Sequence, residues 1–171
     1  MARLLRGYRA AWLKLKTDTD YTLLGVRQDD LSIENNEDVE SGKDVTGAAY
    51  VNVKGYNPET SLSYIADSSD SIYPALEAIN NGLLTDDAHI QFEMIVGTFT
   101  DEIAKIGGAA ANLTSEYAYK TDCIVTVTSS GGDTSGYHLE TTIRETGGRT
   151  VGTITVTKGT GVPSFTAASG S

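Results

Sequence analysis

The stretch Ser71-Ile-Tyr-Pro-Ala-Leu-Glu-Ala-Ile-Asn-Asn-Gly82 contains the clearest helical pattern in the sequence. Its apolar residues recur every three or four positions, which places them on one helical face: Ile72, Ala75, Leu76, Ile79 and Leu83. Pro74 is compatible with a helix because it falls in the first turn, and Gly82 supplies a left-handed residue that can end one. Oxygen-bearing side chains just before the stretch can cap its start: Ser69, Asp70 and Ser71. The sequence therefore predicts one helix over about residues 70–82.

Around this helix the apolar period changes from about 3.6 to two, which is typical of strands. The pattern predicts strands at 10–15, 21–25, 48–56, 61–66, 90–96, 122–128, 137–145, 150–157 and 162–167. Residues 101–113 are rich in Gly and Ala and predict a loop or a short turn of helix, and 129–136 predicts a turn-rich connection. With 18 glycines, 3 prolines and 39% hydrophobic residues, we expect one mainly β domain with the helix lying across a sheet.

The formal net charge of −10 argues against a protein that grips nucleic acid through its phosphates. It is compatible with a channel through which DNA slides without adhering. Cys123 is the single cysteine and lies in a strand pattern, so we expect it to be buried and unreactive. No apolar run is long enough to span a membrane, and the basic N-terminal residues do not lead into the apolar core of a signal peptide. We therefore expect the chain to stay in a reducing cytoplasm before any assembly.

The segment 27–47 is strongly acidic, with seven Asp and Glu residues against Arg27 and Lys43. It predicts either a polar strand followed by an excursion or one long loop, and long loops in compact domains are usually functional or ordered by a partner. The basic segment 1–16 would be complementary to residues 29–44 across an interface between copies. The alternative is that both segments are solvated and never meet.

Candidate catalytic and metal-binding groups do not converge in this sequence. His89 and His138 lie in different predicted strands with no ligand at metal-binding spacing, so we expect both at the surface. The acid pairs Asp29–Asp30 and Asp86–Asp87 predict solvated turns. The sequence thus predicts no catalytic, cofactor-binding or metal-binding residues, and we do not expect an enzyme.

The order of several motifs carries a family resemblance over about residues 10–167. Asn35-Asn-Glu-Asp-Val-Glu-Ser-Gly-Lys-Asp-Val-Thr-Gly47 precedes a strand, a Pro turn and the helix. Cys123-Ile-Val-Thr-Val-Thr-Ser-Ser-Gly-Gly-Asp-Thr-Ser-Gly-Tyr137, Gly147-Gly-Arg-Thr-Val-Gly152 and Gly161-Val-Pro-Ser-Phe-Thr166 follow it. In this order the chain resembles the tail tube (major tail) proteins of long, non-contractile-tailed bacteriophages.

The resemblance implies a β-sandwich or barrel with one flanking helix, related to the ring protein of type VI secretion tubes. Copies would form hexameric rings, and the rings would stack into a hollow conduit for genome delivery. An acidic loop or arm at about 27–47 would reach a neighbouring copy. The inter-subunit contacts that the resemblance suggests are Asn35, Asn36, Asp44, Val45, Thr46 and Gly47.

The resemblance also implies partners and a location. The lumen would hold a tape-measure protein, then let double-stranded DNA pass without specific binding along polar and acidic side chains. Which of Glu93, Glu140 and Glu145 faces the lumen stays open. Tail initiator and terminator proteins would bind the tube ends, and this subunit would not insert into a membrane. The chain would assemble in the host bacterial cytoplasm and end in the virion tail.

Two alternatives stay open at this point. One is the tube protein of a contractile tail or phage-like bacteriocin, which shares the fold. The other is a β-sandwich ligand-binding module, such as a carbohydrate-binding or adhesin domain. Such a module favours a patch of exposed aromatic residues, whereas the nine tyrosines here are scattered along the chain.

Overall fold

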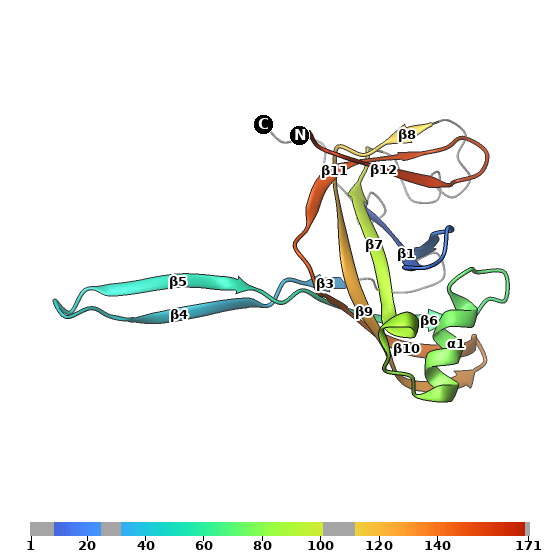
Figure 1. The fold of residues 1–171 in the computed structure, drawn as a ribbon, viewed down its shortest axis with the longest axis horizontal. Coiled ribbons are helices and arrows are strands. Elements are labelled where there is room, and N and C mark those ends of the chain that lie inside the picture. The colour runs from blue at the N-terminus through green and yellow to red at the C-terminus, as the bar shows by residue number, and fades with distance from the viewer. Residues whose placement is uncertain (1–8, 25–31, 101–111, 170–171) are drawn as a thin grey trace.

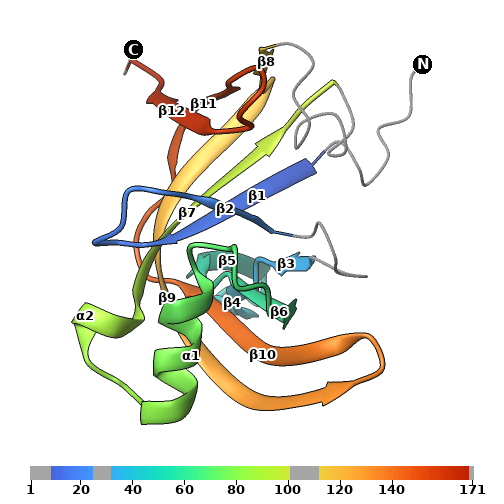
Figure 2. The same ribbon diagram turned by 90° about the vertical axis from the view of Figure 1, so that its right-hand side faces the viewer.

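The computed structural model describes residues 9–24, 32–100 and 112–169, and it shows a mainly β chain. Ten strands form one strongly curled sheet with the shape of half a barrel, and two more form a separate hairpin that projects from it (Figures 1 and 2). The predicted β-dominated fold is confirmed. Its form is a curled sheet closed on one side by a helix rather than two separate sheets.

The sheet is built outward from β9, the longest strand. One edge of β9 pairs with β7, then β1 and β2, while its other edge pairs with β11 near its start and with β10, then β6 and β3, over the rest. The strand bounds are β1 Arg9–Leu15, β2 Thr22–Leu24, β3 Ser32–Glu34, β6 Glu59–Ile65, β7 Gln91–Thr98, β8 Leu113–Thr114, β9 Tyr117–Asp133, β10 Gly136–Glu145, β11 Thr150–Val156 and β12 Pro163–Ala167. β10 and β11 pair with different parts of the same edge of β9 and diverge from it, which is where the sheet curls (Figure 1).

Helix α1 (Tyr73–Gly82) packs its apolar face into the curve of the sheet. Ile72, Leu76 and Ile79 are buried there as the periodicity predicts. The main core beside them combines residues of β1, β6, β7, β9 and β10, among them Leu13, Leu62, Phe92, Met94, Cys123, Val125, Leu139 and Ile143. The predicted burial of Cys123 is confirmed, since 1% of it is exposed.

The ends of α1 differ from the prediction. The N-cap is Ile72, and no side chain caps it, because Ser71 bonds instead to Thr22 and to the carbonyl of Asp20. At the other end the left-handed residue is Leu83, with φ 48°, rather than Gly82. Leu83 is consequently 79% exposed and does not contribute to the buried face.

A second core lies on the opposite face of the central strands. Trp12 packs there against Phe99 with ring centroids 6.0 Å apart and an angle of 69° between the rings. Strands β11 and β12 cover this cluster through Ile154 and Val156, with Phe165 at its margin. Both faces of β1 and β7 are therefore buried at this end of the sheet, which explains why their apolar residues fill both phases of the alternation.

Two local predictions are corrected. Asp87–Ile90 form the short helix α2, so His89 lies in a helical turn rather than in a strand, and Asp86 takes the N-cap position without a side-chain capping hydrogen bond. The predicted connection at 129–136 is mostly strand, since β9 runs to Asp133 and only two residues turn the chain into β10. The predicted loop at 101–113 lies outside the described residues up to 111, and single-domain organisation stays a prediction.

Candidate functional site

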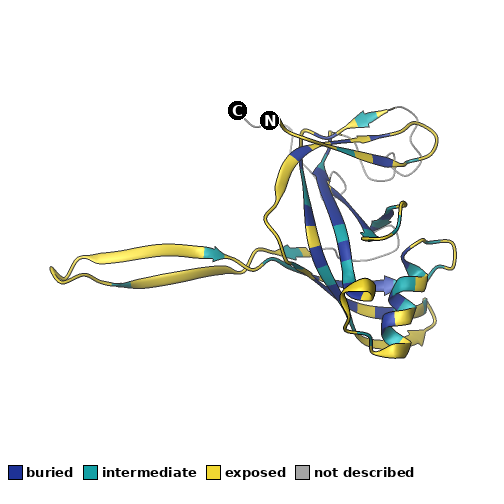
Figure 3. Ribbon diagram, viewed as in Figure 1, coloured by how far each residue is buried: buried dark blue, intermediate teal, exposed yellow. Residues whose placement is uncertain are grey.

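Residues 37–43 of the acidic segment form the first strand of a hairpin that projects far from the sheet. The hairpin consists of β4 (Glu37–Lys43) and β5 (Ala49–Tyr56), which pair with each other and are here called the arm, residues 37–56. Both strands are exposed over most of their length (Figure 3). The acidic loop or arm predicted at about 27–47 overlaps this hairpin, but residues 32–34 pair with β6 in the sheet, the hairpin also includes the strand 49–56, and residues 27–31 lie outside the described residues.

The root of the arm is fixed by two asparagines that the sequence analysis selected. Asn36 adopts a left-handed conformation with φ 44°, and its side-chain nitrogen donates to the carbonyl of Asn57 at 3.2 Å. The amide of Asn57 donates in return to the carbonyl of Asn36 at 3.0 Å. Asn35 accepts a hydrogen bond from Arg149 at 3.1 Å. Both asparagines therefore make contacts within their own chain that set the direction of the arm.

The tip of the arm contains the other four selected residues. The Oδ1 atom of Asp44 accepts hydrogen bonds from the Thr46 hydroxyl at 2.6 Å, the Thr46 amide at 2.8 Å and the Ala48 amide at 3.0 Å. The Thr46 hydroxyl is the main reason why the pKa of Asp44 lies below its ordinary value. Gly47 has φ 85°, which favours glycine, and Val45 is fully exposed. The selected residues thus occupy the two opposite ends of the arm.

The two faces of the arm differ in chemistry. Val39 lies opposite Val53, and Val51 lies opposite Ser41, so these valines share one face, the valine face, defined by Val39, Val51 and Val53. They are 42%, 69% and 52% exposed. The other face carries Tyr50, whose ring covers Gly42, and an ion pair between Lys54 and Glu40 at 3.2 Å. The arm is therefore amphipathic, with its apolar face open.

The valine face is not among the contacts predicted from the sequence. The signal was present in the alternation of Val51 and Val53, but that pattern also fits a strand buried against the sheet. Only the projection of the arm shows that these valines have no cover within the described residues.

A groove begins at the root of the arm and follows the sheet past Arg149. It consists of two adjoining hollows of about 440 and 360 Å³, both lined by Arg149, and is here called the Arg149 groove. Tyr56 and Pro58 line the end near the arm, and Tyr117, Tyr119 and Val151 line the other. The groove thus combines aromatic and aliphatic side chains with a cation near its middle.

Arg149 is held firmly in this groove. Its guanidinium donates two hydrogen bonds of 2.8 Å to Glu145, and its central carbon lies 4.1 Å from the centre of the Tyr119 ring. The bond to Glu145 raises the pKa of Arg149. Only 2% of the Glu145 side chain is exposed, so its charge is directed toward Arg149 rather than toward solvent.

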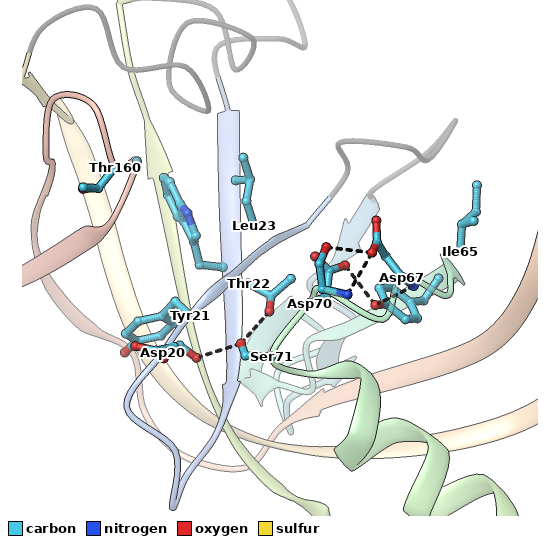
Figure 4. A pocket seen from close by; sticks show the side chains of 13 residues that line it. Asp20, Tyr21, Thr22, Leu23, Ile65, Asp67, Asp70, Ser71 and Thr160 are labelled. Atoms are coloured by element: carbon cyan, nitrogen blue, oxygen red, sulfur yellow. Dashed lines mark hydrogen bonds between the residues drawn. The ribbon is translucent and has the colours of Figure 1, made fainter.

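A third hollow of about 510 Å³ lies between β2, the segment before α1 and the turn before β12 (Figure 4). Its walls are joined by polar contacts: the Tyr64 hydroxyl donates to Asp70 at 2.9 Å, and Thr22 bonds with Ser71 at 2.9 Å. These contacts fasten the start of α1 to β2 and β6. The polar side chains that line this hollow therefore have a structural role.

The histidines lie at the surface beside single carboxylates. His89 is 2.7 Å from Asp86, and His138 is 3.3 Å from Asp133 and 2.9 Å from Ser135. Within the described ranges, no group of three or more His, Cys, Asp and Glu side chains could hold a metal ion. In the same part of the chain, no helix is both long and apolar enough to cross a membrane.

Beyond the second core, the face of the sheet opposite α1 is lined by paired charges. Lys16 contacts Asp122 at 2.8 Å, and Arg144 contacts Glu59 at 2.9 Å. Glu93 lies between Lys14 and Lys120 and also accepts a hydrogen bond from Tyr21. By strand register Glu140 belongs to this face, here called the paired-charge face, whereas Glu145 points to the other face.

Comparison with known proteins finds a solved structure with a similar fold. No family model matches the sequence, and no curated protein matches it. A solved structure described as the "Cryo-EM structure of the anti-feeding prophage cap (AFP tube terminating cap)" is similar, with a TM-score of 0.51 and 11% sequence identity. The alignment covers 88% of this chain and 91% of that chain. At this identity the likeness shows the fold, and it confirms a mainly β, tail-tube-like architecture.

Proposed function

We propose that this chain is a structural subunit of a phage tail tube. Six copies would form a ring, and stacked rings would form the hollow conduit for genome delivery. The observation that carries the proposal is the arm, whose valine face is open although it projects into solvent. The likeness of the fold to a tube terminating cap supports the same conclusion.

Unpaired strand edges supply the physical reason for ring formation. Within the described residues β2 pairs only with β1, and β3 covers only part of the outer edge of β6. Exposed edges invite pairing with another copy. Joining the β2 edge of one copy to the β6 edge of the next would continue the curled sheet, and closing the ring would leave no free edge at these strands.

The paired-charge face suits the lumen of such a tube. Its lysines and its arginine already contact carboxylates, so few cations are free to replace the counterions of a passing duplex. In this arrangement Glu93 and Glu140 would face the lumen, and Glu145 would not. The lumen would therefore be balanced in charge rather than strongly acidic, and DNA would pass with little adhesion.

The remaining parts of the proposal concern partners and place. A tape-measure protein would occupy the lumen before DNA, and initiator and terminator proteins would bind the two tube ends. Assembly would occur in the host bacterial cytoplasm, and the product would be part of the virion tail. We further propose that the chain has no catalytic activity, because its polar groups are engaged in structural contacts.

A tube-terminating cap is a second candidate. It is favoured by the similar structure, which is described as a tube terminating cap, and by the coverage of nearly all of both chains. A cap would form a single ring that does not stack on itself, whereas a tube subunit adds ring upon ring. The tube of a contractile tail or phage-like bacteriocin would stack in the same way and is distinguished by the presence of a sheath.

Sedimentation velocity over a wide range of protein concentration tests the proposal. A tube subunit should give species of six chains followed by much larger particles as the concentration rises. A cap should stop at six chains. A monomer at every concentration would overturn both candidates and favour a ligand-binding module.

A further inference from the structure

The arm cannot be stable through its own contacts alone. A two-stranded hairpin is marginal in water, and this one leaves its three valines without cover among the described residues. Its own body is not the cover, because the hydrogen bonds between Asn36 and Asn57 fix a root from which the arm points away (Figure 1). The valine face therefore needs a surface on another molecule.

The Arg149 groove offers a surface of the matching kind. Tyr117 is 74% exposed and Val151 is 65% exposed, which is unusual for large apolar residues on a sheet that is otherwise well covered. Both lie in the same hollow as Tyr119, and Tyr56 is 60% exposed at the other end of the groove. The groove thus presents apolar side chains along its length, as the arm does.

The net charges of the whole arm and of the Arg149 groove are also opposite. The arm contains four acidic residues, Glu37, Asp38, Glu40 and Asp44, against Lys43 and Lys54. The groove contains Arg9 and Arg149 against Glu145, whose side chain is almost completely buried. Opposite net charges favour the approach of the arm of one copy to the groove of another.

We propose that the valine face of one copy docks in the Arg149 groove of a second copy. The inference rests on the proposed function and deepens it by naming the surface that receives the arm. Each copy carries both surfaces, and the groove begins at the root of its own arm. The contact is therefore heterologous, with every copy giving an arm and receiving one, which produces rings or filaments rather than closed dimers.

Disulfide trapping between two separately made variants tests this contact. Val51→Cys places a thiol on the valine face, and Val151→Cys places one in the groove. Both sites are exposed, and Cys123 is 1% exposed and does not compete. After mixing and mild oxidation, we expect a crosslinked pair that contains one chain of each variant, and 0.5 M salt should slow its formation.

Two matched variants act as controls. Asn52→Cys moves the thiol to the other face of the arm, and Val162→Cys moves it to a body site that is 57% exposed but lies outside the groove. Each control mixture should crosslink at least fivefold more slowly. Equal rates with Val162→Cys, or a predominance of Val51→Cys homodimers, would overturn the proposed docking site.

The oligomeric state separates this inference from the proposed function. If the unmodified chain forms rings or tubes while the Val51→Cys and Val151→Cys mixture crosslinks no faster than the controls, the docking site is wrong and the tube subunit stands. If the chain sediments as a monomer at every concentration, the proposed function fails, and the docking site fails with it.

Discussion

Val39 and Val53 lie directly opposite each other on the two strands of the arm, and 42% and 52% of them are exposed. Valine pairs of this kind stabilise a sheet when another layer covers them. Here the cover is absent from the described part of the same chain. We therefore expect the exposed Val39–Val53 pair to become covered when copies of the chain assemble.

Replacing Val53 by serine should weaken assembly. Burial of a valine side chain contributes about 1.5–3 kcal/mol, and 1.4 kcal/mol corresponds to about a tenfold change in an equilibrium constant. The concentration needed for half-assembly, measured by light scattering, should therefore rise about tenfold or more. Asn52→Ser, on the other face of the arm, should leave it within about twofold. An equal effect of both variants would show that the valine face is not buried on assembly.

Gly152 should not tolerate a side chain. A Cβ atom there would meet the carbonyl oxygen of Thr166 and would lie 2.6 Å from the ring of Phe165, on the strand that covers the second core. Gly152→Ala should reduce the free energy of unfolding by about 1–3 kcal/mol through overpacking, as measured by urea denaturation. Gly148→Ala is the control, because nothing lies within 4 Å of the added atom. Unchanged stability of Gly152→Ala would contradict the close pairing of β11 and β12.

Leu83→Gly should stabilise the protein. Leu83 holds a left-handed conformation that costs a residue with a Cβ atom about 1–2 kcal/mol, and its side chain is 79% exposed, so little packing is lost. We expect the free energy of unfolding to rise by about 1 kcal/mol in urea. Leu83→Ala keeps the Cβ atom and should give no comparable gain. A loss of stability in the glycine variant would place the left-handed residue elsewhere.

Asp133 should titrate far below an ordinary aspartate. The Ser135 hydroxyl, with the Ser135 amide and His138, lowers the pKa of Asp133 from 3.8 to about 2. Because the folded-state pKa is depressed, its stabilising effect is present above pH 3.8 and disappears as the pH falls through about 2. The amide resonance of Ser135 should follow this midpoint in an NMR titration, and Asp133→Asn should abolish the transition. A midpoint near 3.8 would show that the turn between β9 and β10 does not form these bonds.

The helix and most strands could be predicted because their apolar residues follow one period over many positions. The end of α1 could not, since local preference favours the left-handed conformation at Gly82, whereas the structure has it one residue later, at Leu83. Strand β9 continues into a run of Ser, Gly and Asp whose composition predicts a loop. Pairing with β10 supplies the hydrogen bonds that these residues lack locally.

The candidate site was predictable in part. The tip of the arm follows from local chemistry, because an aspartate two residues before Thr46 can accept its amide and hydroxyl protons. Asn35 and Asp44 lie at opposite ends of the arm because of the direction in which the arm projects. Hydrogen bonds between residues far apart in the sequence fix that direction, from Asn36 to Asn57 and from Arg149 to Asn35. The Arg149 groove likewise unites residues far apart in the sequence, so no local pattern could indicate it.

Negative-stain electron microscopy of the purified chain at high concentration tests whether the chain builds tubes. We expect hollow tubes of stacked six-fold rings, which Val53→Ser should shorten or abolish. Isolated monomers at every concentration would contradict this expectation.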